Sequence, residues 1–107
     1  MNLITLTKKI RLVSDKYATK FGINRDKVWY LLKLQEEMGE LTQAYLSYTG
    51  RARHKNKTVD ELKQAFEMEI ADVLCHILLL IDSEKVNVKK AVKEKWLKRL
   101  LKTKVSH

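Results

Sequence analysis

Four acidic residues, arranged as two pairs, are the strongest candidates for a functional site in this sequence. Glu37 is paired with Glu40, and Glu69 with Asp72, and the members of each pair are three residues apart. On a helix, residues at this spacing lie on one face, so each pair offers two carboxylates to a common point. If the two helices pack together, the four groups repel and their pKa values rise unless a cation neutralises them. Such oxygen ligands suit Mg²⁺, with Mn²⁺ as the second choice.

The second pair lies in an almost continuous apolar stretch, from residue 69 to residue 81, which indicates a largely buried helix. Glu69, Asp72 and His76 are its polar exceptions. Burying unpaired carboxylates is costly without a compensating cation or base, so this pair favours a metal site. The alternative is a buried ion pair with a Lys or Arg of another helix. His76 is expected to be a hydrogen-bonded residue behind the ligands more than a ligand itself.

The first pair is less distinctive when taken alone. Glu37 and Glu40 border an apolar stripe of a predicted helix, and the same acidic pattern is common on solvated helix faces. The stripe consists of Leu31, Leu34, Met38, Leu41 and Tyr45. The meaning of the first pair therefore depends on the second.

Four helices are expected to position these residues. The first runs from Leu3 to about Phe21 and ends at Gly22, on a stripe formed by Leu3, Leu6, Ile10, Val13, Tyr17 and Phe21. Asn24 is expected to cap the second, which runs through Tyr48 and stops at Gly50.

A basic loop, 49–57, follows the second helix. Thr58 and Glu61 then match a capping box that begins the third helix. Asn87 is expected to cap a fourth helix with Val88, Val92, Trp96 and Leu100 on its apolar side and many lysines on the remainder.

The composition agrees with an all-α fold. The 107 residues are expected to form one domain, 1–107, with 45% hydrophobic and 33% charged residues, no proline and three glycines. The single Cys75 fits a buried thiol in a reducing compartment. The sequence shows no evident signal peptide and no apolar run long enough for a bilayer, so we expect a cytoplasmic protein with no membrane partner.

The net charge of +9 indicates a polyanionic partner, either nucleic acid or nucleotide. Basic residues gather at 51–57 and 85–104, while acidic residues concentrate in the two helices that carry the pairs. Basic flanks around an acidic centre suit a metal-bound phosphate better than a duplex backbone, so nucleic acid is not the expected partner.

The two motifs together resemble a known family. Glu36-Glu37-Met38-Gly39-Glu40 followed by Glu69-Ile70-Ala71-Asp72 resembles the EExxE and ExxD signature of the MazG-like, all-α nucleoside triphosphate pyrophosphohydrolases. The resemblance extends over roughly residues 28–102, including Thr49-Gly50-Arg51-Ala52-Arg53. It implies a four-helix MazG-like bundle, completed by assembly into a homodimer or homotetramer.

The resemblance also implies an activity. The enzyme would use Mg²⁺ to hydrolyse a nucleoside triphosphate to the monophosphate and pyrophosphate, with a role in removing noncanonical or excess nucleotides. Glu37, Glu40, Glu69 and Asp72 would bind the metal, and Glu36 would orient or deprotonate the attacking water. Phosphoryl transfer depends mainly on positioning and electrostatics, so no Ser or Cys nucleophile is needed.

Five further residues are candidates for substrate binding: Trp29, Lys33, Arg53, Lys95 and Lys98. Lys95 and Lys98 match the lysines of the family's C-terminal motif, but Arg99 stands where an Asn is expected. An arginine there can still contact phosphate. Trp29 is a candidate for stacking on the base, with a place in the core or an interface as the alternative.

Two competing functions remain open. The chain could be a non-enzymatic basic helical module that binds nucleic acid or a partner protein, with its acids in structural ion pairs. It could also keep the fold and take another substrate, as a phosphoribosyl-ATP pyrophosphatase would. The sequence does not determine the base or sugar preference, the number of metal ions, the oligomeric state, the effect of Arg99 or the biological role.

Overall fold

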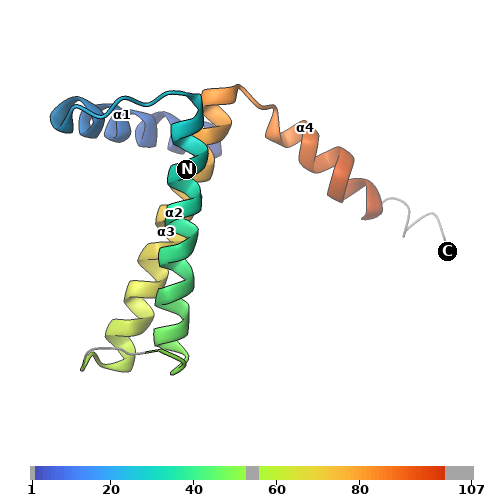
Figure 1. Cartoon of the computed structure of the whole chain (residues 1–107). Helices are drawn as coiled ribbons and strands as arrows, with labels where there is room; N and C mark the ends of the chain where they lie inside the picture. The colour runs from blue at the N-terminus through green and yellow to red at the C-terminus, as the bar shows by residue number, and fades with distance from the viewer. Residues whose placement is uncertain (1, 53–55, 101–107) are drawn as a thin grey trace.

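The computed structural model describes residues 2–52 and 56–100, and all of the regular structure in these residues is helical (Figure 1). The helices are α1 (Leu3–Phe21), α2 (Lys27–Tyr48), α3 (Val59–Glu84) and α4 (Val88–Val92), and α4 continues into a π-helical turn, η1 (Lys93–Leu97). The all-α prediction is therefore confirmed. Among the described residues, none of the helices is long and apolar enough to cross a bilayer.

Most predicted helix ends are confirmed by their capping interactions. Gly22 ends α1 in the left-handed conformation, at φ 63°, which glycine adopts without strain. Thr58 and Glu61 form the predicted capping box, and the Asn87 side chain accepts a hydrogen bond from the Lys90 N–H. These residues fix where α3 and α4 begin.

The predicted cap of α2 is wrong by two residues. Asp26, and not Asn24, accepts a hydrogen bond from the Trp29 N–H at 2.8 Å. The reason lies in Arg25, which donates to Ser14 Oγ at 2.7 Å and pairs with Asp15 at 2.6 Å. Because these contacts hold Arg25 against α1, the chain stays non-helical until Asp26.

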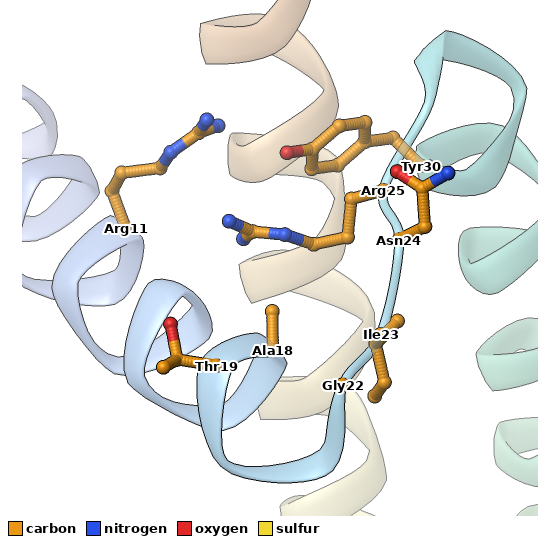
Figure 2. A pocket seen from close by; sticks show the side chains of 8 residues that line it. All are labelled: Arg11, Ala18, Thr19, Gly22, Ile23, Asn24, Arg25 and Tyr30. Carbon is orange, nitrogen blue, oxygen red and sulfur yellow. The ribbon is translucent and has the colours of Figure 1, made fainter.

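The core of the chain is an antiparallel pair formed by α2 and α3, and α1 lies across one end of it (Figure 1). An ion pair between Arg11 and Asp82, at 3.3 Å, joins α1 to the end of α3. The Arg11 and Arg25 guanidiniums lie over the ring of the buried Tyr30, at 5.6 and 5.9 Å from its centroid (Figure 2). These contacts fix α1 relative to the beginning of α2.

The four helices of one chain do not close into a bundle. α4 and η1 project away from the α2–α3 pair and have no extensive contact with another described helix (Figure 1). The radius of gyration is 17.6 Å, against about 13 Å for a compact domain of this length. The fold within a single chain is thus a helical hairpin, a cross-helix and a projecting arm.

The predictions of which faces of α2 and α3 are buried need correction. Leu31 and Met38 of the α2 stripe are 53% and 43% exposed, and α2 instead buries Tyr30 and Glu37. In α3, apolar side chains that α1 and α2 do not cover remain exposed, and Ile70, Leu74 and Ile77 are among them. The expectation of a largely buried α3 therefore fails within one chain, because only two neighbours cover it.

Candidate metal centre

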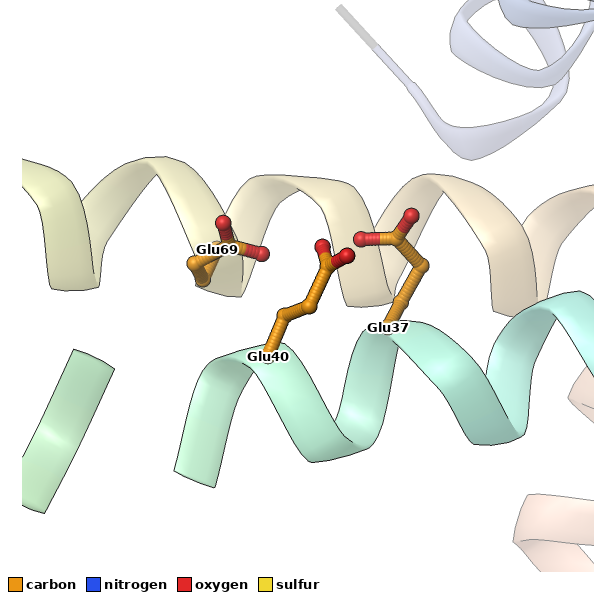
Figure 3. Close-up of side chains that lie close together, drawn as sticks. All are labelled: Glu37, Glu40 and Glu69. Carbon is orange, nitrogen blue, oxygen red and sulfur yellow. The ribbon is translucent and has the colours of Figure 1, made fainter. Parts of the chain in front are cut away.

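Three of the four carboxylates predicted as ligands meet between α2 and α3 (Figure 3). Glu37 and Glu40 come from consecutive turns of α2, and Glu69 faces them from α3. One carboxylate oxygen from each lies within 4.8 Å of the others. The antiparallel hairpin thus brings Glu69 next to two residues that lie 29 and 32 positions earlier in the sequence.

Glu37 is the central residue of this carboxylate cluster (Glu37, Glu40 and Glu69). It is only 7% exposed, and within the described residues neither its Oε2 nor the Oε2 of Glu69 has a hydrogen-bond partner. Burying a polar oxygen without a partner costs free energy, and the cost is larger when the group is charged. Each helix thus contributes to the cluster one oxygen that a bound cation could satisfy.

The pKa values of Glu37 and Glu69 reflect the same cost of burying neighbouring carboxylates. The pKa of Glu37 is raised to about 7, first by burial, then by hydrogen bonding with Glu40 and by the charges of Glu40 and Asp72, against a lowering by Lys33. Burial, followed by the charges of Asp72 and Glu40, also raises the pKa of Glu69. Without a cation, Glu37 is therefore partly protonated near neutral pH.

Lys33 and His76 place nitrogen atoms close to the Glu37 carboxylate. Lys33 Nζ lies 3.4 Å from Glu36 Oε1 and 3.7 Å from Glu37 Oε1, and His76 Nε2 lies 3.9 Å from that same Glu37 oxygen. Burial, followed by the charge of Lys33, lowers the pKa of His76, so its imidazole is mainly neutral at pH 7. Neutralisation of Glu37 by these two groups is only partial.

The donor set fits a hard divalent cation. Carboxylate oxygens are the usual protein ligands of Mg²⁺, and oxygens on opposite sides of one such ion are about 4.2 Å apart. The 4.8 Å spread of the three glutamates is close to that limit. Small side-chain rotations would therefore suffice for the three carboxylates to share one ion, while Glu37 would gain a partner for its unpaired oxygen.

Asp72 and Glu36 stand beside the cluster and not in it. Asp72 is exposed and lies outside the group of three, although its charge raises the pKa values of Glu37 and Glu69. Glu36 is also exposed and pairs with Lys33. Both residues line a cavity of about 680 Å³ that adjoins the cluster.

This cavity lies between α1 and the α2–α3 pair. Trp29 and Lys33, both predicted to bind substrate, contribute to its wall together with Glu37, His76 and Cys75. The α1 side is formed by residues that were not predicted as site residues: Lys9, Ile10, Val13, Ser14 and Tyr17. Their only sequence signal is the predicted helical stripe, which contains Ile10, Val13 and Tyr17 and indicates a packing face.

Two further predicted cations, Lys95 and Lys98, are not at the cluster in this chain. Lys95 belongs to η1 and Lys98 follows it, both on the arm that projects away from α2 and α3 (Figure 1). Arg53 lies outside the described residues. Contact between Lys95 or Lys98 and a substrate at the cluster would therefore require the arm of another copy.

Comparisons of the chain with protein-family models, with curated proteins and with solved structures gave no match. We therefore argue function from the residues and geometry of the site.

Proposed function

We propose that the chain is a nucleoside triphosphate pyrophosphohydrolase that uses Mg²⁺, or Mn²⁺ in its place. One observation carries this proposal. The buried carboxylate of Glu37, with an unpartnered oxygen, faces Glu40 and Glu69 beside a cavity large enough for a small ligand. The paired acidic motifs of the MazG-like enzymes agree with it, and such a substrate is consistent with a cytoplasmic location.

In this proposal Glu37, Glu40 and Glu69 would hold the cation, with Asp72 as the fourth ligand. The cation supplies positive charge to the phosphate oxygens. Glu36, at the cavity wall, accepts a proton as the water oxygen attacks phosphorus. The bond between phosphorus and the α–β bridging oxygen breaks, which leaves a nucleoside monophosphate and pyrophosphate.

Lys33 has a second role in this proposal. In the structure its ammonium group lies between Glu36 and Glu37. Once a cation neutralises Glu37, the same ammonium can turn to a phosphate oxygen and form a charge-assisted hydrogen bond. Its departure would also free Glu36 to act as the base.

Assembly into a homodimer or homotetramer is part of the proposal. The chain exposes 8950 Å², whereas a compact monomer of 12.6 kDa would expose about 6,200 Å². An excess of this size is comparable to the area that obligate interfaces bury. A second copy would complete a four-helix bundle, and its basic arm, with Lys95 and Lys98, would be attracted to the acidic α2–α3 pair.

The test is a panel of ribonucleoside and deoxyribonucleoside triphosphates, normal and modified, incubated with the purified protein and Mg²⁺. We expect equimolar monophosphate and pyrophosphate from at least one member. Release of inorganic phosphate alone, or no turnover across the panel with Mg²⁺ or Mn²⁺, would refute the proposal. Phosphoribosyl-ATP belongs in the panel because the fold alone does not distinguish this substrate.

A second candidate function rests on the arm. α4 and η1 carry an exposed apolar side, with Val92, Trp96 and Leu97, and a basic side, with Lys89, Lys90 and Lys93. Such a helix suits a non-enzymatic module that binds nucleic acid or a partner protein. Salt separates the two functions: nucleic-acid affinity would fall steeply with added salt, whereas turnover would follow the divalent metal.

A further inference from the structure

The cavity beside the carboxylate cluster joins two kinds of surface. Glu37 and Asp72 contribute carboxylates to its wall, and Tyr17 and Trp29 contribute aromatic rings. The two surfaces are close, because the Trp29 ring lies 6.4 Å from the His76 ring, and His76 Nε2 lies 3.9 Å from Glu37 Oε1. A ligand that fills the cavity would touch both.

The wall opposite Trp29 comes from α1. Ile10, Val13 and Tyr17 follow one another at helical spacing and all line the cavity. α1 is held in place by the Arg11–Asp82 ion pair and by the contacts of Arg25 with Ser14 and Asp15. This wall therefore has a defined position that does not depend on a cation at the cluster.

The acidic and aromatic surfaces of the cavity indicate the chemical class of its ligand. Carboxylates that hold a cation suit phosphates, and aromatic side chains suit a flat ring system, on which stacking is sequence-tolerant. A volume of about 680 Å³ falls in the range of small-ligand sites. We propose that this cavity receives the base of a nucleotide, with Trp29 as a stacking wall and with Val13 and Tyr17 of α1 as residues that determine base specificity.

This inference rests on the proposed function for the direction in which the nucleotide lies, but its test does not need turnover. Trp29 and Trp96 are the two tryptophans of the sequence. Trp96→Phe, on the projecting arm, leaves Trp29 as the only tryptophan and therefore as a fluorescence probe of the cavity. The probes are the nucleoside 5′-monophosphates, titrated in EDTA so that no metal contributes.

We expect a saturable change of Trp29 fluorescence with at least one monophosphate. In the same background, Val13→Phe fills the cavity and should raise the Kd about tenfold, the scale of a lost stacking contact. Leu12→Phe is the matched control, because Leu12 is similarly exposed on α1, at 61% against 68% for Val13, and does not line the cavity. Tyr17→Ala, with Leu12→Ala as its control, tests the same wall by deletion.

The possible results distinguish failure of the base-binding inference from failure of the proposed function. No saturable change with any monophosphate, or an equal Kd for Val13→Phe and Leu12→Phe, would overturn the inference. A second copy of the chain filling this cavity would give that same negative result. Hydrolysis with an unchanged KM in Val13→Phe would overturn the inference and leave the proposed function intact, whereas binding without hydrolysis would do the reverse.

Discussion

Glu37 is the residue at which stability and the proposed chemistry oppose each other. Its carboxylate is buried between two helices, next to Glu40 and Glu69, with one oxygen unpartnered among the described residues. A packed apolar side chain at this position would serve the hairpin better. A bound cation would offset the free-energy cost of burying the Glu37 carboxylate, and it is the simplest explanation for an acid at this position.

The pH dependence of stability follows from the raised pKa of Glu37. The ordinary value is about 4.5 and the value in the folded chain is about 7. Between these values the folded chain binds more protons than the unfolded chain, so the free energy of unfolding of the metal-free protein falls as pH rises. The slope is at most about 1.4 kcal/mol per pH unit for one proton.

Thermal unfolding in EDTA from pH 4.5 to 8 measures this slope. Glu40, Asp72, Lys33 and His76 also act on the site, so the comparison with Glu37→Gln isolates the contribution of one carboxyl group. We expect the variant to lose most of the decline with pH. An identical decline in both proteins would contradict the assignment of the raised pKa to Glu37.

Glu69→Gln tests the cluster as a metal site without any substrate. The variant removes one charge and should leave the metal-free protein at least as stable, because repulsion with Glu40 and Asp72 decreases. Wild type should be stabilised by Mg²⁺ by about 2.7 kcal/mol at a concentration one hundred times its Kd. Glu69→Gln should lose this stabilisation.

Glu67→Gln is the matched control for that experiment, because Glu67 is an exposed acid of the same helix outside the cluster. Differential scanning calorimetry with and without Mg²⁺ gives the comparison. If Glu69→Gln and Glu67→Gln gain equally from Mg²⁺, the carboxylate cluster is not the site of binding.

At the scale of the helices, most helix ends could be predicted from the sequence, whereas the buried face of α2 could not. Gly22, the Thr58–Glu61 pair and Asn87 are local signals, so the sequence alone was sufficient to place them. The error at Asn24 arose because Arg25 contacts α1, and that contact is not local. The predicted α2 stripe includes Leu31 and Met38, which are exposed, whereas the buried residues of α2 are Tyr30 and Glu37. The sequence pattern thus places Glu37 at the border of the apolar face, whereas the structure buries it.

Thr58→Ala tests how much the hairpin depends on its local signals. The change removes the hydroxyl that accepts from the Glu61 N–H at 3.1 Å and disrupts the capping box. We expect a loss of about 1 kcal/mol in the free energy of unfolding. Urea denaturation measures it, and Thr58→Ser, which keeps the hydroxyl, should behave like wild type. An unchanged midpoint in Thr58→Ala would show that the cap contributes nothing.

At the scale of the whole molecule, the exposed apolar side chains are the main departure from the sequence-based expectation. Ile70, Leu74 and Ile77 of α3 are 46%, 44% and 38% exposed, and Trp96 of the arm is 61% exposed. A pattern of hydrophobic residues predicts that a face is buried, but it does not say whether the same chain or another covers it. The bundle expected from the resemblance therefore depends on assembly.

Leu74→Arg tests that assembly. We expect wild type to sediment as a dimer or tetramer, and Leu74→Arg to shift the equilibrium toward the monomer by placing a charge in the proposed interface. Gln64→Arg, an exposed change on the same helix, should leave the assembly unchanged. Analytical ultracentrifugation gives the masses, and a wild-type protein that stays monomeric at every concentration would exclude this part of the account.

The most direct test of the central claim is the Mg²⁺ dependence of triphosphate hydrolysis in wild type, Glu37→Gln and Glu67→Gln. The best substrate of the nucleotide panel is incubated with each protein, and the products are separated by anion-exchange chromatography. The account predicts monophosphate and pyrophosphate from wild type and Glu67→Gln only when Mg²⁺ is present, and a loss of at least about a hundredfold in Glu37→Gln. Equal turnover by Glu37→Gln, or turnover by wild type in EDTA, would contradict it.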